Sequence, residues 1–286
     1  MSAAESFTAW PAPAKLNLFL HIVGRRADGY HLLESLVAFT DLADEIVAAP
    51  SDRLSLAVAG PLAAALVDEA DNLVLEAARR LADRGGVAPR AALRLTKRIP
   101  VAAGLGGGSA DAAAALGALV ELWRLALPVE ELFDLAARLG ADVPMCLAGR
   151  AAVVSGVGER LAPALPLPPC AILLVNPGTP LATAEVFARR QGPFSSPRPV
   201  ARPWTDARGL AVALAERGND LTEAAVALRP MIADVLGALR GTDALHVAMS
   251  GSGATCFALF ETAAQAERVA TTLPAAWWRH AGKLDG

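Results

Sequence analysis

Four glycines stand within five positions of this chain, directly before an alanine-rich run: Gly104, Gly106, Gly107 and Gly108. A glycine inside a packed helix or strand costs roughly 0.5–1 kcal/mol relative to alanine, so this density predicts a loop. The run from 110 to 122 is predicted to be a helix, with Ser109 and Asp111 supplying N-cap chemistry. Because the N-terminus of a helix binds anions, we expect a phosphate site here, with a flexible hinge as the alternative.

The composition predicts a globular protein with a substantial core. The chain has 286 residues, of which 54% are hydrophobic and 19% charged. Its net charge of −3 offers no basic surplus, so we expect no nucleic-acid partner. The uncharged stretch 161–184 contains six prolines and cannot form a membrane helix. No signal peptide is evident and the three cysteines are isolated in sequence, so we expect a cytoplasmic protein without a membrane partner.

Lysine is rare in this chain: of 26 basic residues only three are lysines, Lys15, Lys97 and Lys283. A lysine retained against that bias is a weak indication that an ammonium group is needed at its position. Lys15 and Lys97 lie in the predicted strands 13–23 and 91–97, whereas Lys283 lies in a segment interpreted as a polar tail.

Periodicity and turn signals place strands and helices along the chain without strict alternation. The predicted strands are 13–23, 30–39, 45–49, 54–58, 91–97, 151–155, 171–175, 245–250 and 255–259. The predicted helices are 72–84, 110–122, 129–139, 183–190, 209–216, 221–228, 231–239 and 263–273. This mixture favours an α+β fold. The proline cluster 163–169 predicts a domain crossing, and 192–204 an exposed loop.

Lys15 and Asn17 share one face of the first predicted strand, and Asp142 follows a helix end among apolar neighbours. Local sequence leaves two plainer alternatives open: Lys15 on a solvated strand edge, and Asp142 as a helix cap. If the two side chains met, the lysine would lower the pKa of the carboxyl group. Such a pair could deprotonate a hydroxyl group for attack on a phosphate.

Tyr30 and His31 follow a turn and combine an aromatic ring with an imidazole. That combination suits recognition of a planar base, although a hairpin with a buried tyrosine is the plainer local alternative. The glycine cluster matches neither the Walker motif nor Gly-x-Gly-x-x-Gly, which leaves other nucleotide-binding families open.

Three segments, in order, resemble the motifs of the GHMP kinases: 13–17, 100–111 and 250–255. The segments 24–31 and 139–144 further resemble the branch that phosphorylates 4-diphosphocytidyl-2-C-methyl-D-erythritol in the non-mevalonate isoprenoid precursor pathway. The resemblance implies a phosphotransferase that uses ATP and Mg²⁺ and acts on the C2 hydroxyl of that substrate. A homoserine- or mevalonate-type kinase, or a non-catalytic nucleotide-binding protein of the same fold, is the alternative.

The resemblance also implies a two-domain α+β fold with the active site in the inter-domain cleft. We place the ATP-binding domain at 1–165 and a second domain, contributing to substrate binding, at 166–286. Asp142 would accept the hydroxyl proton, while Lys15 would keep Asp142 ionised and contact the transferring phosphoryl group.

The remaining implied roles are binding roles. Substrate would be bound by Asn17, Tyr30, His31, Thr183, Phe187, Gly251 and Gly253, with Tyr30 and Phe187 stacking on cytosine and His31 bonding to its edge. ATP would be bound by Asn72, Lys97, Pro100, Gly104, Leu105, Gly106, Gly107, Gly108, Ser109 and Ala110. Ser109 is the expected Mg²⁺ ligand, because a hydroxyl beside phosphates commonly binds this ion.

Overall fold

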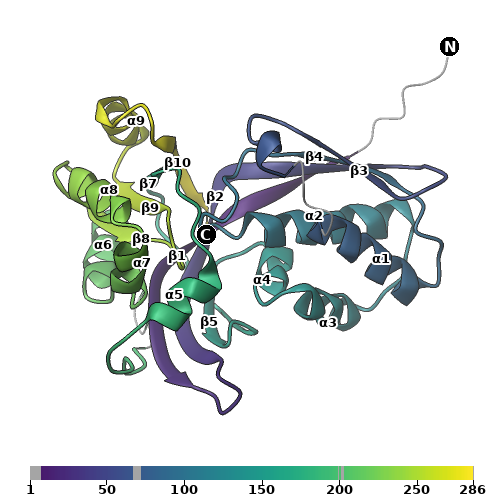
Figure 1. Cartoon of the computed structure of the whole chain (residues 1–286), viewed down its shortest axis with the longest axis horizontal. Helices are drawn as coiled ribbons and strands as arrows, with labels where there is room; N and C mark the ends of the chain where they lie inside the picture. The colour runs from purple at the N-terminus through teal and green to yellow at the C-terminus, as the bar shows by residue number, and fades with distance from the viewer. Residues whose placement is uncertain (1–7, 67–71, 199, 201–202, 286) are drawn as a thin grey trace. The chain divides into compact units, whose positions relative to one another are not determined.

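The computed structural model describes residues 8–66, 72–198, 200 and 203–285. The chain forms two compact units (Figure 1), each assembled from separate stretches of sequence. Unit 1 comprises 1–14, 43–101 and 107–149, and unit 2 comprises 15–42, 102–106 and 150–286. The predicted continuous domains, 1–165 and 166–286, divide the chain differently and stay a prediction.

Two long strands supply residues to both units: β1 (Ala9–Arg25) and β2 (His31–Ala49). In unit 1 the second half of β2 pairs antiparallel with β4 (Ala92–Thr96), and β4 pairs parallel with β3 (Ser55–Ala59). A 3₁₀ helix, η1 (Ala63–Leu66), follows β3. Four α-helices of unit 1 pack on one another (Figure 1): α1 (Leu73–Gly85), α2 (Gly107–Leu122), α3 (Val129–Leu139) and α4 (Val143–Ala148).

Unit 2 is built on antiparallel pairings. The first half of β2 pairs with β5 (Ala152–Gly156), which pairs with β6 (Arg160–Pro163). Residues Phe39 and Thr40 of β2 also pair with β10, and the sheet continues in the order β10 (Trp278–Asp285), β7 (Ala171–Asn176), β9 (Cys256–Phe260), β8 (His246–Met249).

The helices of unit 2 are α5 (Thr183–Arg189), α6 (Ala207–Ala215), α7 (Thr222–Leu228), α8 (Met231–Arg240) and α9 (Ala263–Thr272). Alternate residues of β7, such as Leu173 and Val175, point into one buried apolar cluster with Val235 of α8 and Val269 of α9. β7 and β9 are buried at every position, as is typical of interior strands, while the helices bury the apolar face that packs on this cluster.

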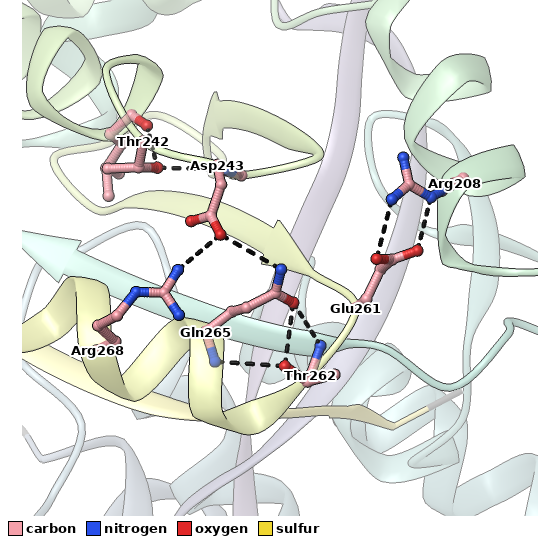
Figure 2. A network of polar contacts seen from close by, with 9 residues as sticks. Arg208, Thr242, Asp243, Glu261, Thr262, Gln265 and Arg268 are labelled. Carbon is pink, nitrogen blue, oxygen red and sulfur yellow. Dashed lines mark hydrogen bonds and ion pairs between the residues drawn. The ribbon is translucent and has the colours of Figure 1, made fainter.

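Polar side chains cap the N-terminus of α9 (Figure 2). Thr262 and Gln265 form a reciprocal capping box at its start, with the Thr262 hydroxyl accepting from the backbone N–H of Gln265. Asp243 accepts from both Gln265 and Arg268, which ties the turn before β8 to this helix.

The mixed architecture confirms the predicted α+β fold, but several local expectations were wrong. β10 lies where no element was expected, because its residues do not alternate in polarity, and Lys283 belongs to this strand rather than to a polar tail. The short elements α4 and β6 were also missed, and the strands predicted at 30–39 and 45–49 are one strand, β2.

The capping assignment at the glycine cluster was wrong as well. Helix α2 begins at Gly107, so Ser109 and Asp111 lie inside it rather than before it. The Asp111 carboxylate is buried and binds the amine of Lys97, which leaves it unavailable as a cap.

Lys97 is the centre of a buried ion cluster in unit 1. Its amine lies 2.5 Å from a carboxylate oxygen of Asp44 and 2.7 Å from one of Asp111. The other oxygen of Asp44 accepts from the backbone N–H groups of Arg98 and Ile99. The side chains of Lys97, Asp44 and Asp111 are almost wholly buried, so the cluster fixes the segment that leads from β4 toward the glycine cluster.

One ammonium group in this cluster is shared by two buried carboxyl groups. Burial raises the pKa of Asp111 from its ordinary 3.8 to about 7; the amine of Lys97 opposes this shift and the charge of Asp44 adds to it. Burial alone would lower the pKa of Lys97, but the charges of Asp111 and Asp44 outweigh it and raise that pKa. The second oxygen of Asp111 is buried without a hydrogen-bond partner, so nothing at that oxygen offsets the cost of burying a charge on this carboxyl group.

Asp111→Asn is expected to remove a pH-dependent destabilisation. With its pKa raised from 3.8 to about 7, folded Asp111 keeps a proton that the unfolded chain releases. Stability therefore falls as pH rises through this window, and the loss is complete above it. Above pH 7 the variant should exceed the wild type by roughly 1 kcal/mol or more in unfolding free energy, and the gain should vanish near pH 4.

Urea denaturation of both proteins across this pH range measures the effect. Asp83→Asn, at an exposed position on α1, is the matched control and should give a curve parallel to the wild type. A parallel curve for Asp111→Asn would show that Asp111 titrates at the same pH in the folded and unfolded chain.

Candidate functional site

The first motif is buried. Lys15 and Asn17 lie on β1 with 6% and 5% of their surfaces exposed, so the alternative of a solvated strand edge for Lys15 is wrong. The Lys15 amine donates to Oδ1 of Asn17 at 2.6 Å. A buried ammonium group requires a hydrogen-bond acceptor, and Asn17 provides one here.

A serine that the sequence did not single out completes this group. Nδ2 of Asn17 lies 2.8 Å from the hydroxyl of Ser35 on β2, and that hydroxyl lies 2.5 Å from the backbone carbonyl of Phe19. Ser35 is fully buried. No sequence signal distinguished it, since a serine in a strand is ordinary and its partner stands eighteen positions away.

The part of the glycine cluster that belongs to unit 2 packs directly on the first motif. The backbone N–H of Lys15 donates to the carbonyl of Leu105 at 3.0 Å. Gly104 and Gly106 have positive φ angles of 76° and 66°. A Cβ on Gly106 would lie 2.6 Å from the Lys15 side chain, so this position requires glycine for its conformation and for its close approach.

The third motif closes the same group. The Ser250 hydroxyl accepts from the backbone N–H of Asn17 and donates to the carbonyl of Gly104, both at 3.1 Å. Nδ2 of Asn219 donates to the carbonyls of Met249 and Gly251, which holds the turn from outside the motif. Residues from all three sequence motifs are thus brought together within unit 2.

The two glycines predicted to bind substrate, Gly251 and Gly253, both lie in this turn. Gly251 and Gly253 have φ angles of 56° and 87°. A Cβ on Gly251 would lie 3.2 Å from Oδ1 of Asn17, so the turn passes close to the first motif. Ser252 between them is hydrogen-bonded to Thr183 at 2.9 Å, at the start of α5.

A separate pocket of unit 2, with a volume of about 280 Å³, holds two more of the predicted residues. It is lined by Arg25, Gly29, His31, Ala184, Phe187, Ala188 and Arg190. The rings of His31 and Phe187 lie 5.3 Å apart between centroids. Sequence reasoning missed both arginines: Arg25 lies inside the 24–31 segment, whereas nothing in the sequence marked Arg190.

The surroundings of His31 in this pocket favour its neutral form. Burial, followed by the charges of Arg25 and Arg190, lowers its pKa below the ordinary value of 6.5. A neutral imidazole has one nitrogen that donates and one that accepts, which suits the edge of a heterocyclic base. Tyr30 is 66% exposed and outside the pocket lining, so the alternative of a buried tyrosine is wrong.

The remaining predicted nucleotide residues belong to unit 1. Gly107, Gly108, Ser109 and Ala110 form the first turn of α2, whose N–H groups have no partner within the helix. The others stand at the ends of neighbouring elements: Asn72 at the N-cap of α1, where its side chain accepts from the N–H of Val74, and Lys97 and Pro100 after β4. A Cβ on Gly108 would have no neighbour within 4 Å apart from its own helix backbone.

Asp142 lies at the start of α4 and is only partly buried. Although it occupies the N-cap position, its side chain makes no capping hydrogen bond, which argues against the helix-cap alternative. The predicted pairing with Lys15 joins residues of different units and stays a prediction.

Neither a preformed metal cluster nor a membrane-spanning helix occurs among the residues that the structure describes. No three histidine, cysteine or acidic side chains gather there in a metal-binding arrangement. No described helix combines the length and the apolar character needed to cross a bilayer.

Comparison with known proteins agrees with the three motifs. Residues 72–150 match the GHMP kinases N terminal domain, and residues 205–279 match the GHMP kinases C terminal domain. The chain is 54% identical over 271 residues to the 4-diphosphocytidyl-2-C-methyl-D-erythritol kinase of Paramagnetospirillum magneticum, covering 93% of this chain and 95% of the relative.

Two solved structures are similar over nearly the whole chain. A crystal structure of 4-(cytidine 5'-diphospho)-2C-methyl-D-erythritol kinase aligns with a TM-score of 0.79 and 38% identity, covering 98% of this chain and 100% of that one. A homoserine kinase from Cytophaga hutchinsonii aligns with a TM-score of 0.74 but 18% identity, covering 100% and 96%, and so shares the fold alone. With this identity over almost its full length, the chain belongs to the 4-diphosphocytidyl-2-C-methyl-D-erythritol kinases, a branch of the GHMP kinase family.

Proposed function

We propose that this chain is an ATP-dependent kinase that phosphorylates the C2 hydroxyl of 4-diphosphocytidyl-2-C-methyl-D-erythritol. Family membership supports the reaction class, and the pocket around His31 and Phe187 is the observation that carries the substrate assignment. It combines an aromatic ring, a neutral imidazole and two guanidinium groups, which suits a base attached to phosphates. Homoserine and mevalonate contain no heterocyclic base that could occupy such a pocket.

The first turn of α2 is the proposed phosphate site. Its free N–H groups and the positive end of the helix dipole attract the phosphates of ATP. Gly108 supports this assignment: a glycine in a helix costs about 1 kcal/mol relative to alanine, and no neighbouring protein atom demands it here. A phosphate group close to the backbone gives a reason for leaving this position without a side chain.

Phosphoryl transfer depends on positioning and on stabilisation of charge more than on covalent chemistry by the protein. In the proposed reaction Asp142 accepts the proton of the C2 hydroxyl as the oxygen attacks the γ-phosphorus of ATP, and ADP leaves. Lys15 supplies positive charge to the transferring phosphoryl group, and Asn17 binds substrate near the reacting hydroxyl. Binding of cytosine in the pocket supplies binding energy far from the reacting atoms, and this energy orients the substrate.

Mg²⁺ fits this site as an ion that arrives with the nucleotide. Mg²⁺ is ordinarily bound through substrate phosphates with few protein ligands, so a preformed cluster of acidic side chains is not required. The Ser109 hydroxyl, in the first turn of α2, is the proposed protein ligand. When bound, the ion neutralises charge on the phosphates. A cytoplasmic location is part of the same proposal, because ATP is available there.

Asp142→Asn should abolish most of the activity. Loss of the general base is expected to lower kcat by about 100- to 10,000-fold, with little change in either KM, because the amide keeps the shape but cannot take the proton. A coupled assay of ADP release, with ATP and 4-diphosphocytidyl-2-C-methyl-D-erythritol, measures this. Asp134→Asn, at an exposed position on α3, is the matched control and should retain wild-type turnover.

The same assay separates the alternative functions. Wild-type turnover of homoserine or mevalonate in place of the cytidine compound would reject the substrate, and no turnover of any of them would favour a non-catalytic nucleotide-binding protein. Full activity of Asp142→Asn would remove Asp142 from the mechanism while leaving the substrate in place.

The KM for the cytidine substrate should depend on the protonation of His31. Since its pKa lies below 6.5, the imidazole stays neutral at pH 7, and KM should be constant near neutrality. As the pH falls through this lowered pKa, protonation removes the acceptor nitrogen, so the KM for the cytidine substrate should rise while the KM for ATP stays level. Steady-state kinetics as a function of pH tests this, and His31→Gln should flatten the profile. An unchanged KM through the acidic range in the wild type would exclude this role.

A further inference from the structure

We propose that Ser35 is a positioning residue for this kinase reaction: its hydroxyl fixes the side-chain amide of Asn17 so that the carbonyl oxygen faces Lys15. Ser35 is fully buried on β2 and cannot itself contact a ligand. It acts through Asn17 and Lys15, so the inference rests on the roles proposed above for those two residues.

The direction of the hydrogen bonds follows from counting hydrogens. A serine hydroxyl has a single hydrogen, and a backbone carbonyl can only accept. The 2.5 Å contact between Ser35 Oγ and the carbonyl of Phe19 therefore takes that hydrogen. Toward Asn17 the Ser35 oxygen is left with lone pairs alone, so the group of Asn17 that lies 2.8 Å away must be the donor, Nδ2.

The opposite orientation of the Asn17 amide would lose both of its hydrogen bonds, the one to Ser35 and the one from Lys15. Rotated by half a turn, Asn17 would set its carbonyl oxygen against the lone pairs of Ser35. Its NH₂ group would then face the ammonium of Lys15, where Oδ1 now accepts at 2.6 Å. Oxygen and nitrogen of an amide are distinguished only through such a network, and here one hydroxyl settles the choice.

The rest of Asn17 is fixed independently. Its backbone N–H donates to Ser250, which in turn donates to Gly104, so the strand position does not depend on Ser35. Removing the Ser35 hydroxyl should therefore leave the three motifs together and release only the orientation of the amide. The charge-assisted bond to Lys15 would be weakened, and with it the placement of the ammonium group.

The kinetic test compares Ser35→Ala with Ser35→Thr. The alanine variant should lower kcat by about 10- to 100-fold, the factor expected for a lost hydrogen bond to a charged group, with the KM for ATP little changed. The threonine variant keeps the hydroxyl and should recover most of kcat. Thermal unfolding of each variant establishes that the assay temperature lies below its transition, so that kcat refers to folded enzyme.

Thr242→Val is the matched control in the same unit. The Thr242 hydroxyl also donates to a backbone carbonyl, that of Leu239, and also accepts from an N–H group, that of Ala244 (Figure 2 shows this turn). It has no bond to any of the three motifs, so its removal should leave kcat unchanged. Wild-type kcat for Ser35→Ala, or an equal loss of kcat in Thr242→Val, would overturn the proposal.

A second measurement needs neither substrate nor turnover. The chain contains four asparagines, so their side-chain amides can be resolved by ¹⁵N-edited NMR and Asn17 assigned with Asn17→Asp. In the wild type one amide proton of Asn17 should exchange slowly with water, and this protection should be lost in Ser35→Ala. Rapid exchange of both protons in the wild type would overturn the proposal even if Ser35→Ala does not fold. An inactive wild type with a protected Asn17 amide would instead reject the proposed function alone.

Discussion

The hydroxyl of Ser250 is the contact on which the arrangement of unit 2 depends. It accepts from the first motif, at the N–H of Asn17, and donates to the glycine cluster, at the carbonyl of Gly104. Three segments separated by up to 233 positions are thereby joined at one oxygen atom. The close approach of Gly104 and Gly251 to this junction leaves no space for side chains there, so glycine at these positions and the serine between the strands serve the same geometry.

Both units bury charged groups in ways that relate to the reaction. In unit 1 Lys97 donates to the carboxyl groups of Asp44 and Asp111, and Asp44 also binds the backbone after β4, whereas in unit 2 Lys15 donates to the amide oxygen of Asn17. The contacts of Lys97 suit a structural role. Lys15 lies beside the glycine cluster, where its proposed role of stabilising a transferring phosphoryl group requires a positive charge.

The sequence allowed the α+β fold, the family and most of the helices to be predicted, because glycine and proline signals and helical periodicity are local. It did not reveal β10, whose polar residues form an interior strand only because β2 and β7 lie on either side of it. Nor could it distinguish Ser35, Asp44 or Arg190 from ordinary surface or strand residues, since their importance arises from partners distant in sequence. For Asp111 the local sequence was misleading. It predicted a helix cap, but in the structure the side chain binds the distant Lys97 instead.

The position of β10 has a consequence for how the sheet of unit 2 protects its edges. Leu284 pairs with Thr40, and the strand also pairs along its length with β7, so β10 covers one edge of each of these two strands at the same time. If β10 were displaced, one edge of β2 and one edge of β7 would present open backbone groups to the solvent. Local release of this one strand would therefore expose two edges able to pair with another chain, so retention of β10 protects unit 2 against aggregation.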